Sequence, residues 1–348
     1  AIAKRLRRQK LLTILAAIFV FGVLVTVHEL GHFITAKMTG MKVEEFAIGF
    51  GPNIYQQKDG DTLYSLRAIP LGGYNKIAGM DPEDPWEPNG FKAKSIPARM
   101  LVILAGSLMN FILPVILFSG IFMIDGIEKP VDKPILGIVV ENKAAYNAGL
   151  EVGDKILTIN GAPMQTWNDV VTTLRANGTN EVTLTAERAG DVHTYKMLPE
   201  YNEELGRPLI GISPKFIKER VGVVDSIKLG FTSTQSVIVM MVEGLQRIIT
   251  GKASAEVSGP IGVAQMAGQV AAEGLLPLLN FVAFLSINLG VINLLPLPAL
   301  DGGHFILLLY EGLRGKPLGA KAMHHIQTIG IAIILAITIF STFKDITR

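Results

Sequence analysis

The sequence predicts a polytopic α-helical membrane protein with four transmembrane helices, a membrane-associated β-hairpin region and an inserted α+β domain. Three observations support this fold class. Of the 348 residues, 49% are apolar and 18% are charged, a balance richer in apolar and poorer in charged side chains than soluble proteins have. Several uncharged stretches are long enough to cross a bilayer. The middle of the chain, in contrast, has the mixed composition of a soluble module.

Apolar stretches with few or no charges predict the spans. The four predicted transmembrane spans are residues 11–36, 100–124, 274–300 and 326–343. Each is long enough to cross an apolar bilayer core of roughly 30 Å as a helix. The run between Lys228 and Glu243 is too short, and charged residues flank it at helical spacing. We therefore expect residues 215–272 to hold an amphipathic helix and a connector.

A β-hairpin region is predicted at 49–74, between the first two spans. Two runs rich in β-forming residues, 54–57 and 62–66, flank an Asp-Gly pair, which is a strong turn signal. We expect 49–52 to form a tight turn before the hairpin. Residues 70–74 contain too much proline and glycine to be expected to continue a strand.

The soluble domain is expected at 127–214, between two membrane halves at 1–124 and 273–348. Thr166, three residues before Asp169, predicts the start of a helix. A second hairpin is expected around the Ala-Gly pair at 189–190. The domain is therefore predicted to contain both strands and helix.

This domain resembles a PDZ domain of the form found in bacterial proteases. The resemblance rests on the motifs at 148–150, 153–154 and 159–161. It implies that the domain binds a peptide segment, because PDZ domains add an extended peptide to a sheet edge. The alternative is a spacer domain that restricts access by its bulk alone.

The strongest chemical motif lies at the end of the uncharged run that begins at Leu11. On a helix, His28 and His32 lie one turn apart on one face, which is the geometry that two imidazoles need to bind one zinc ion. Glu29 lies beside them, where it can act on a metal-bound water. Ionisable residues inside a membrane span are costly and are functional by default. The alternative is a chance match on a soluble helix.

A third zinc ligand must come from elsewhere in the chain. The sequence has no cysteine, so any ligand is a histidine or a carboxylate. Asp301 is the best candidate, because the first and third spans cross the bilayer in the same direction and each carries its polar motif near its C-terminal end. His304 is the second candidate, and we expect the Gly-Gly pair between the two residues to form a turn.

Other residues near the predicted metal site are candidates for substrate binding. Pro296 and Pro298 predict unwound backbone, which membranes tolerate only where it is buried or lines a wet cavity. Asn293 is a candidate for binding the substrate backbone or an oxyanion, and interhelical hydrogen bonding is the alternative. Gly106 and Asn110 lie one turn apart in the second span, where they serve either close helix packing or a wall that grips an unwound substrate.

Taken together, these motifs resemble the site-2 proteases, which are intramembrane zinc metalloproteases, and most closely their bacterial PDZ-containing branch. The resemblance covers nearly the whole chain, and the matching segments are 28–32, 106–110, 258–262 and 293–303. It implies that His28, His32 and Asp301 bind Zn²⁺ and that Glu29 is the general base. It also implies a part in substrate binding for Asn293, Asn110 and Gly106. It also implies that the stretch after Gly49 is a membrane-associated β region that pairs with the substrate.

The expected function is hydrolysis of a peptide bond within the transmembrane segment of a substrate membrane protein, such as an anti-sigma factor or a signal-peptide remnant. The expected partners are single-span membrane proteins, a peptide at the PDZ-like domain and membrane lipid. A net charge of +2 without a basic stripe argues against nucleic acid. The alternatives are a catalytically silent PDZ membrane scaffold and an anchored zinc peptidase that cuts soluble substrates.

The expected location is the bacterial inner membrane, with several spans and with the PDZ-like domain outside the cytoplasm. The family resemblance supports this orientation. Under the positive-inside rule, basic segments tend to lie in the cytoplasm. Five Lys or Arg among the first ten residues therefore argue against this orientation, whereas basic residues in the loop after the first span favour it.

Overall fold

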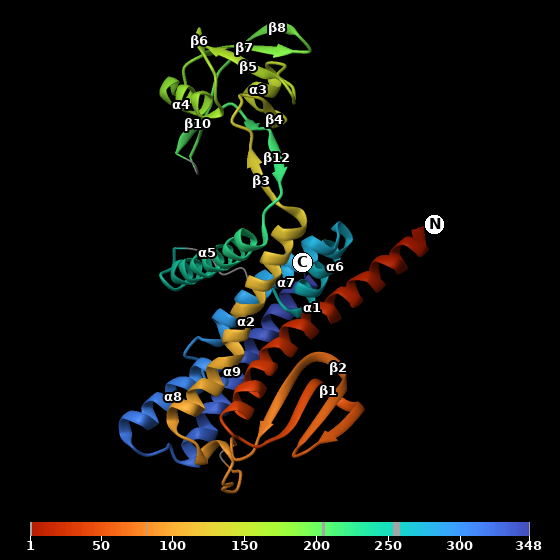
Figure 1. Ribbon diagram of the computed structural model, residues 1–348, viewed down its shortest axis with the longest axis vertical. Helices are drawn as coiled ribbons and strands as arrows, with labels where there is room; N and C mark the ends of the chain where they lie inside the picture. Colours follow the sequence, from red (N-terminus) through yellow and green to blue (C-terminus); the bar gives the residue numbers. More distant parts are fainter. Residues whose placement is uncertain (1, 82, 204–205, 253–257, 348) are drawn as a thin grey trace. The chain divides into compact units, whose positions relative to one another are not determined.

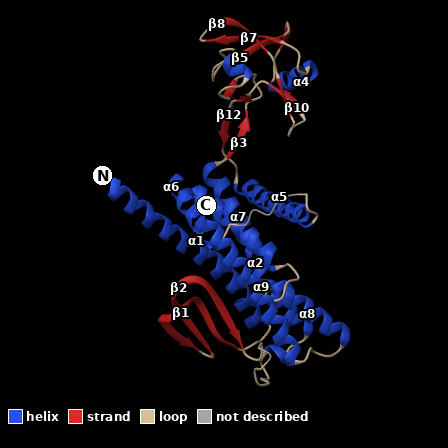
Figure 2. Cartoon of the chain, turned by 180° about the vertical axis from the view of Figure 1, so that it is seen from behind, coloured by secondary structure: helices blue, strands red, loops and turns tan. Residues whose placement is uncertain are grey.

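The computed structural model describes residues 2–81, 83–203, 206–252 and 258–347 (Figure 1). The chain divides into two compact units. The first combines Ala1–Met123 with Gly222–Arg348, and the second is Ile124–Val221. Figure 2 shows that helices dominate the first unit, whose strands are confined to β1 and β2, and that strands dominate the second. The second unit is therefore inserted into the first.

Long helices make up most of the first unit. They are α1 (Ile2–Met38), α2 (Ile96–Asp125), α5 (Val223–Ile249), α6 (Pro260–Glu273), α7 (Leu275–Asn293), α8 (Asp301–Arg314) and α9 (Ala320–Thr347). Four segments are long and apolar enough to span a membrane, namely Arg7–Met38, Ile96–Asp125, Leu275–Asn293 and Lys321–Thr347. Each of these four segments overlaps one of the four predicted spans. A short 3-10 turn, Phe91–Ala93, precedes α2.

The core of this unit lies where α1, α2, α6 and α7 meet. Val20 of α1 packs in one buried cluster with Ala267 of α6 and Val282 of α7. Phe118 of α2 packs in a second cluster with Ile287 of α7. The α1 helix, which carries the predicted metal motif, is thus packed against neighbouring helices between Ala16 and Leu24, just before that motif.

The third predicted span, 274–300, is wrong at its end. Helix α7 stops at Asn293, and residues 294–300 are irregular before Asp301 opens α8. Pro296 and Pro298 account for this break, since proline lacks an N–H and crowds the preceding turn. The turn expected at Gly302 and Gly303 is also wrong, because both lie in the first turn of α8.

Helix α6 was not predicted, since 215–272 was expected to hold one amphipathic helix and a connector. Its N-terminus begins in the motif at 258–262. The backbone N–H groups of Gly259 and Gly262 donate to the Asp345 carboxylate on α9, at 3.0 and 2.8 Å. A carboxylate is favourable at this position because the first N–H groups of a helix have no partner within it.

The β region is longer than predicted. Strands β1 (Val43–Asp59) and β2 (Thr62–Ile77) are antiparallel, and residues 45–48 of β1 face 63–66 on one side and 73–76 on the other. The expected stop at 70–74 is wrong, and so is the expected turn at 49–52. Both stretches stay in the strands because glycine accepts the bent backbone there, with φ of 89° at Gly49 and 134° at Gly72.

The second unit is an α+β domain. Its elements are β3 (Ile127–Pro130), β4 (Leu136–Val139), α3 (Ala144–Asn147), β5 (Lys155–Ile159), β6 (Ala162–Pro163), α4 (Trp167–Asn177), β7 (Val182–Arg188), β8 (Asp191–Met197), β9 (Glu200–Asn202), β10 (Arg207–Leu209), β11 (Ile212–Pro214) and β12 (Phe216–Glu219). A four-stranded sheet has the order β6-β5-β7-β8, while β4 pairs with β11, β3 with β12 and β9 with β10. The unit thus extends beyond 127–214, because β12 pairs back onto β3.

Two local predictions in this domain are confirmed. Thr166 caps α4 through a capping box with Asp169, in which each side chain binds the backbone of the other residue. Strands β7 and β8 form the expected hairpin around Ala189 and Gly190. The core beneath them contains Ile156, Leu184 and other fully buried side chains.

One carboxylate of this core makes the stability of the domain depend on pH. The Asp154 side chain is 1% exposed and lies 2.7 Å from the Arg188 guanidinium. Burial works to raise the pKa of Asp154, but hydrogen bonds from Arg188 and from the Glu151 backbone outweigh it and hold the pKa below its usual value. Because the folded-state pKa is the lower one, this contribution is present above the unfolded pKa of about 3.9 and is lost as the pH falls through the folded-state value.

We therefore expect Asp154→Asn to lower the melting temperature of this domain at neutral pH by at least about 4 °C, the shift that 1 kcal/mol produces in a domain of this size. The variant should also lose part of the acid sensitivity of the wild type. Trp167 fluorescence in a Trp86→Phe background reports the transition, and the exposed Asp191→Asn is the control. Equal melting curves for wild type and Asp154→Asn would contradict the role of this ion pair.

Candidate metal centre

Helices α1 and α2 approach each other closely at two glycines. A Cβ at Gly31 would contact the Ala105 carbonyl, and a Cβ at Gly106 would contact the imidazoles of His28 and His32. Small residues permit this approach of helices in membranes. The crossing therefore lies directly at the predicted metal motif.

The structure brings His28, His32 and Asp301 together. The Nε2 atoms of His28 and His32 lie 3.5 and 3.6 Å from Asp301 Oδ2 and 3.2 Å from each other. All three ligand atoms lie within 4.8 Å of one another. Two imidazoles and one carboxylate are the donor set of a catalytic zinc site, which keeps its fourth position open.

His304, the rival ligand, lies elsewhere. Its Nδ1 is 3.1 Å from the Leu300 carbonyl and its Nε2 is 3.5 Å from the Gln327 amide. Within the described ranges, the group of residues that can hold a metal contains Asp301 and not His304.

Neighbouring groups orient both imidazoles for a metal. His32 Nδ1 lies 2.8 Å from the Val102 carbonyl, which can only accept, so Nδ1 carries the proton and Nε2 is free to bind. His28 Nδ1 lies 3.0 Å from the Asn110 amide nitrogen, and Asn110 Oδ1 is buried with no hydrogen-bond partner among the described residues. If the Asn110 amide is flipped, Oδ1 accepts a hydrogen bond from the His28 Nδ1–H. His28 Nε2 then carries no proton and can bind a metal.

The carboxylate ligand is also held in place. Ser107 is fully buried, and its hydroxyl donates to Asp301 Oδ2 at 3.3 Å. The residues present thus fit zinc, since each candidate ligand atom is available and has a neighbour that orients its group.

The predicted substrate-binding residues also lie at this centre. Asn293, the last residue of α7, places its amide nitrogen 3.5 Å from His28 Nε2. Asn110 and Gly106 both contact the imidazoles from α2. Their contacts are with the histidines, so for Asn110 and Gly106 the geometry favours support of the metal ligands over a wall for substrate.

Gly106→Ala should therefore disturb the metal site. Its Cβ would meet His32 Nε2 and His28 Cε1, so the imidazoles must move. We expect at least a tenfold loss of activity and weaker zinc retention, because a 1 Å misplacement of a site can cost about 10²-fold. Gly120→Ala on the same helix, where a Cβ meets nothing within 4 Å, is the matched control. Equal zinc content and activity in both variants would contradict this geometry.

Glu29 has a partner that sequence reasoning missed. Asn75 of β2 donates from its amide nitrogen to the Glu29 carbonyl and to Glu29 Oε2, both at 2.7 Å. The hairpin region was expected to end at residue 74. No spacing signal connects two residues 46 positions apart, so only the fold reveals this contact.

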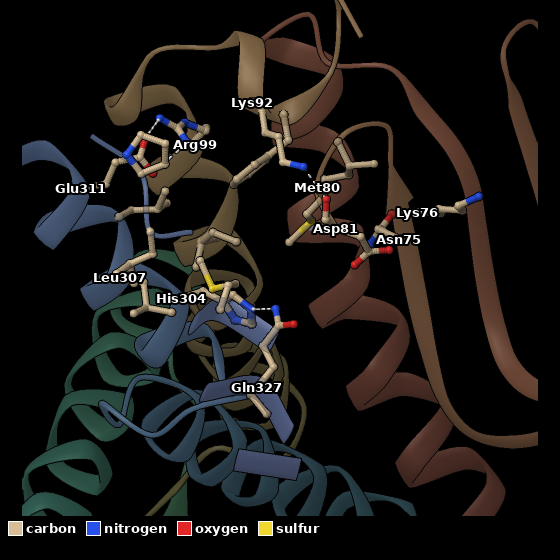
Figure 3. Close-up of a pocket in the computed structure, with 18 of the residues that line it drawn as sticks. Asn75, Lys76, Met80, Asp81, Lys92, Arg99, His304, Leu307, Glu311 and Gln327 are labelled. Atoms are coloured by element: carbon tan, nitrogen blue, oxygen red, sulfur yellow. Dashed lines mark hydrogen bonds and ion pairs between the residues drawn. The ribbon is translucent and has the colours of Figure 1, made fainter. Parts of the chain in front are cut away.

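A cavity of about 800 Å³ adjoins this part of the unit (Figure 3). Its walls come from the end of β2, the start of α2, α8 and α9, and include Asn75, His304 and Gln327. A largely buried ion pair between Arg99 and Glu311, 2.7 Å apart, ties α2 to α8 beside it. The cavity therefore reaches Asn75, the residue that bonds to Glu29.

A His-Glu-x-x-His helix and a carboxylate from a distant segment define a metal-dependent hydrolase whose two histidines lie on an apolar, membrane-length helix. A family model described as peptidase family M50 matches residues 16–337. The chain therefore belongs to peptidase family M50, and it is a zinc metalloprotease.

Relatives of known name match over nearly their whole length. A Clostridium acetobutylicum protein is 39% identical over 334 residues, which cover 96% of this chain and 97% of that one. Zinc metalloprotease RasP of Bacillus licheniformis is 32% identical, with 97% and 99% covered. Regulator of sigma-W protease RasP of Bacillus subtilis is 31% identical, with 97% and 98% covered. This chain is similar to each of them from end to end.

Among solved structures, the PDZ domain of an SdrC-like protein from Listeria monocytogenes matches 25% of this chain and 93% of its own. The TM-score is 0.23 and the identity is 17%.

Proposed function

We propose that this zinc metalloprotease hydrolyses a peptide bond within the transmembrane segment of a membrane protein. The observation that carries the proposal is the placement of His28, His32 and Asp301 within 4.8 Å of one another, with both histidines on a helix long and apolar enough to span a membrane. A membrane scaffold needs neither this ligand set nor Glu29. The family membership and the relatives named as zinc metalloproteases support the enzyme over that alternative.

Each residue of the site has a role in this reaction. When bound by His28, His32 and Asp301, zinc activates water and polarises the substrate carbonyl. Glu29 accepts the proton of the attacking water and passes it to the leaving amine nitrogen. The Asn293 amide donates a hydrogen bond to the oxygen on which negative charge develops. Asn110 holds the His28 imidazole in the orientation that binding requires.

The substrate must unwind before it is cut, because a helix in lipid hides its carbonyls in internal hydrogen bonds. Residues 73–77 of β2 pair with β1 on one side, and no described strand pairs with the other side. This edge lies beside Glu29, since Asn75 bonds to it. We therefore place the extended substrate along 73–77, an edge that would give it backbone hydrogen bonds.

The proposed substrate class is a single-span membrane protein, such as an anti-sigma factor. The Bacillus subtilis relative, named as a regulator of sigma-W protease, supports this choice. The proposed partner of the second unit is a peptide segment that adds to a sheet edge. Strand β11 pairs with β4, and no other described strand pairs with it, which leaves an edge for such a peptide.

The proposed location is the bacterial inner membrane, with the second unit outside the cytoplasm. The chain has no cysteine, so Thr179→Cys introduces a single thiol at an exposed position of this unit. We expect a membrane-impermeant thiol reagent to label it in intact cells. Protection in intact cells, with labelling after lysis, would reverse the orientation.

Purified protein in detergent, incubated with a panel of single-span substrates, tests the proposed reaction. We expect cleavage that a zinc chelator abolishes and that added Zn²⁺ restores. Zinc retention without cleavage of any panel member, in a protein that still binds peptide through its second unit, would favour the scaffold.

A further inference from the structure

Asn75 joins the edge of the β region to the general-base candidate. It belongs to β2 and pairs in register with Phe46 of β1, while its side chain reaches Glu29 of α1. We propose that Asn75 is a positioning residue that holds the Glu29 carboxylate in its working orientation. This inference rests on the proposed function, because it assumes that Glu29 handles the proton in peptide hydrolysis.

One amide nitrogen makes both contacts. Asn75 Nδ2 lies 2.7 Å from the Glu29 backbone carbonyl and 2.7 Å from Glu29 Oε2. Both partners are acceptors when Glu29 is ionised, so the nitrogen, with its two hydrogens, must face them. Hydrogen bonds to a charged acceptor are short and strong. Asn75 therefore holds both Glu29 Oε2 and the Glu29 backbone carbonyl. The other carboxylate oxygen, Oε1, remains available to accept a proton.

The two hydrogen bonds together fix the orientation of the Glu29 side chain relative to α1. A flexible side chain such as glutamate samples several rotamers unless neighbours restrict it. Here the amide links the carboxylate to the main chain of the helix that also carries His28 and His32. The base is thereby kept at a constant position relative to these metal ligands, which is what proton transfer at a bound water requires.

The competing explanation is that Asn75 only fastens β2 to α1. Other contacts already do so: the Phe33 ring of α1 lies 5.8 Å from the Tyr64 ring of β2, and Gly73 packs so closely on α1 that an added Cβ would lie 3.2 Å from Glu29 Cγ and from Val25. Asn75 Oδ1 is buried without a hydrogen-bond partner among the described residues. Such a group costs stability, so an apolar side chain would fasten the strand better. The hydrogen bond to the Glu29 carboxylate therefore explains why an amide side chain, rather than an apolar one, occupies this position.

The position of Asn75 also connects the base to the substrate. Its backbone lies in 73–77, the edge on which we place the extended substrate, and its side chain lines the adjoining cavity (Figure 3). The segment that receives the substrate is thus the same one that orients Glu29.

Two variants of the full chain test this role on a single-span substrate that the wild type cleaves. Asn75→Leu removes the donor and keeps the side-chain volume, and Asn75→Val removes the donor with a β-branched side chain that suits a strand. We expect kcat to fall by about 10- to 100-fold in both, the range typical of lost supporting hydrogen bonds. KM, zinc content and melting temperature should stay near those of the wild type. Asn53→Leu, an exposed amide change in β1 of the same sheet, should keep wild-type kcat.

The outcomes separate the two explanations. A kcat within twofold of wild type in both variants overturns the positioning role. A lower melting temperature or zinc content with a raised KM and an unchanged kcat also overturns it, in favour of a structural fastening. If wild type and Asn53→Leu cleave no single-span substrate, the proposed function itself fails, and the role of Asn75 fails with it.

Discussion

We expect Glu29→Gln to keep its bound zinc and to lose peptide cleavage by about 10³-fold, within the range that general acid–base catalysis contributes. The reason is that glutamine has the shape of glutamate but accepts no proton from water. The three ligand residues are untouched, so the metal site should be retained. The measurement is zinc content by elemental analysis together with turnover of a single-span substrate.

A matched control isolates the chemical change. Glu273→Gln makes the same substitution at an exposed position at the end of α6, and it should turn over at the wild-type rate. Residual turnover of Glu29→Gln at the wild-type rate would remove Glu29 from the mechanism. Loss of zinc from Glu29→Gln would instead show that this residue helps hold the metal.

We expect Asp301→Asn to weaken zinc binding by on the order of 10²-fold, because loss of a residue that merely orients a metal ligand already costs about 10- to 100-fold and Asp301 is itself the proposed ligand. The change preserves shape but removes the negative charge that faces His28 and His32. Ser107 then faces an amide instead of a carboxylate. Activity at limiting zinc should fall by a similar factor.

Competition with a chromophoric chelator measures this affinity. Asp225→Asn, at an exposed position of α5, is the control and should match the wild type. Wild-type zinc affinity in Asp301→Asn would rule out this carboxylate as a ligand. The test would then move to His304→Ala, the second candidate.

The parts of the site that sequence could predict depend on local geometry. His28, Glu29 and His32 follow from the repeat of a single helix, which needs no knowledge of the fold. Asp301 required a further step, in which the direction and depth of two spans were compared. The structure brings it to the histidines by a different local route, because α7 ends at Asn293 and Asp301 opens a new helix.

What sequence could not predict depends on contacts between distant segments. Ser107 meets Asp301 across 194 positions and Asn75 meets Glu29 across 46. Neither contact leaves a periodic pattern in either segment. The continuation of β2 to Ile77 was missed for a related reason, because proline and glycine usually end a strand, whereas here they bend it.

The position of the cut bond tests intramembrane proteolysis most directly. Mass spectrometry of the products that purified protein makes from a single-span substrate gives this position. We predict a cut between apolar residues inside the span, absent from the Glu29→Gln reaction. Cuts confined to the solvent-exposed flanks of the substrate, or efficient cleavage of soluble peptides alone, would contradict the account and indicate an anchored peptidase of soluble segments.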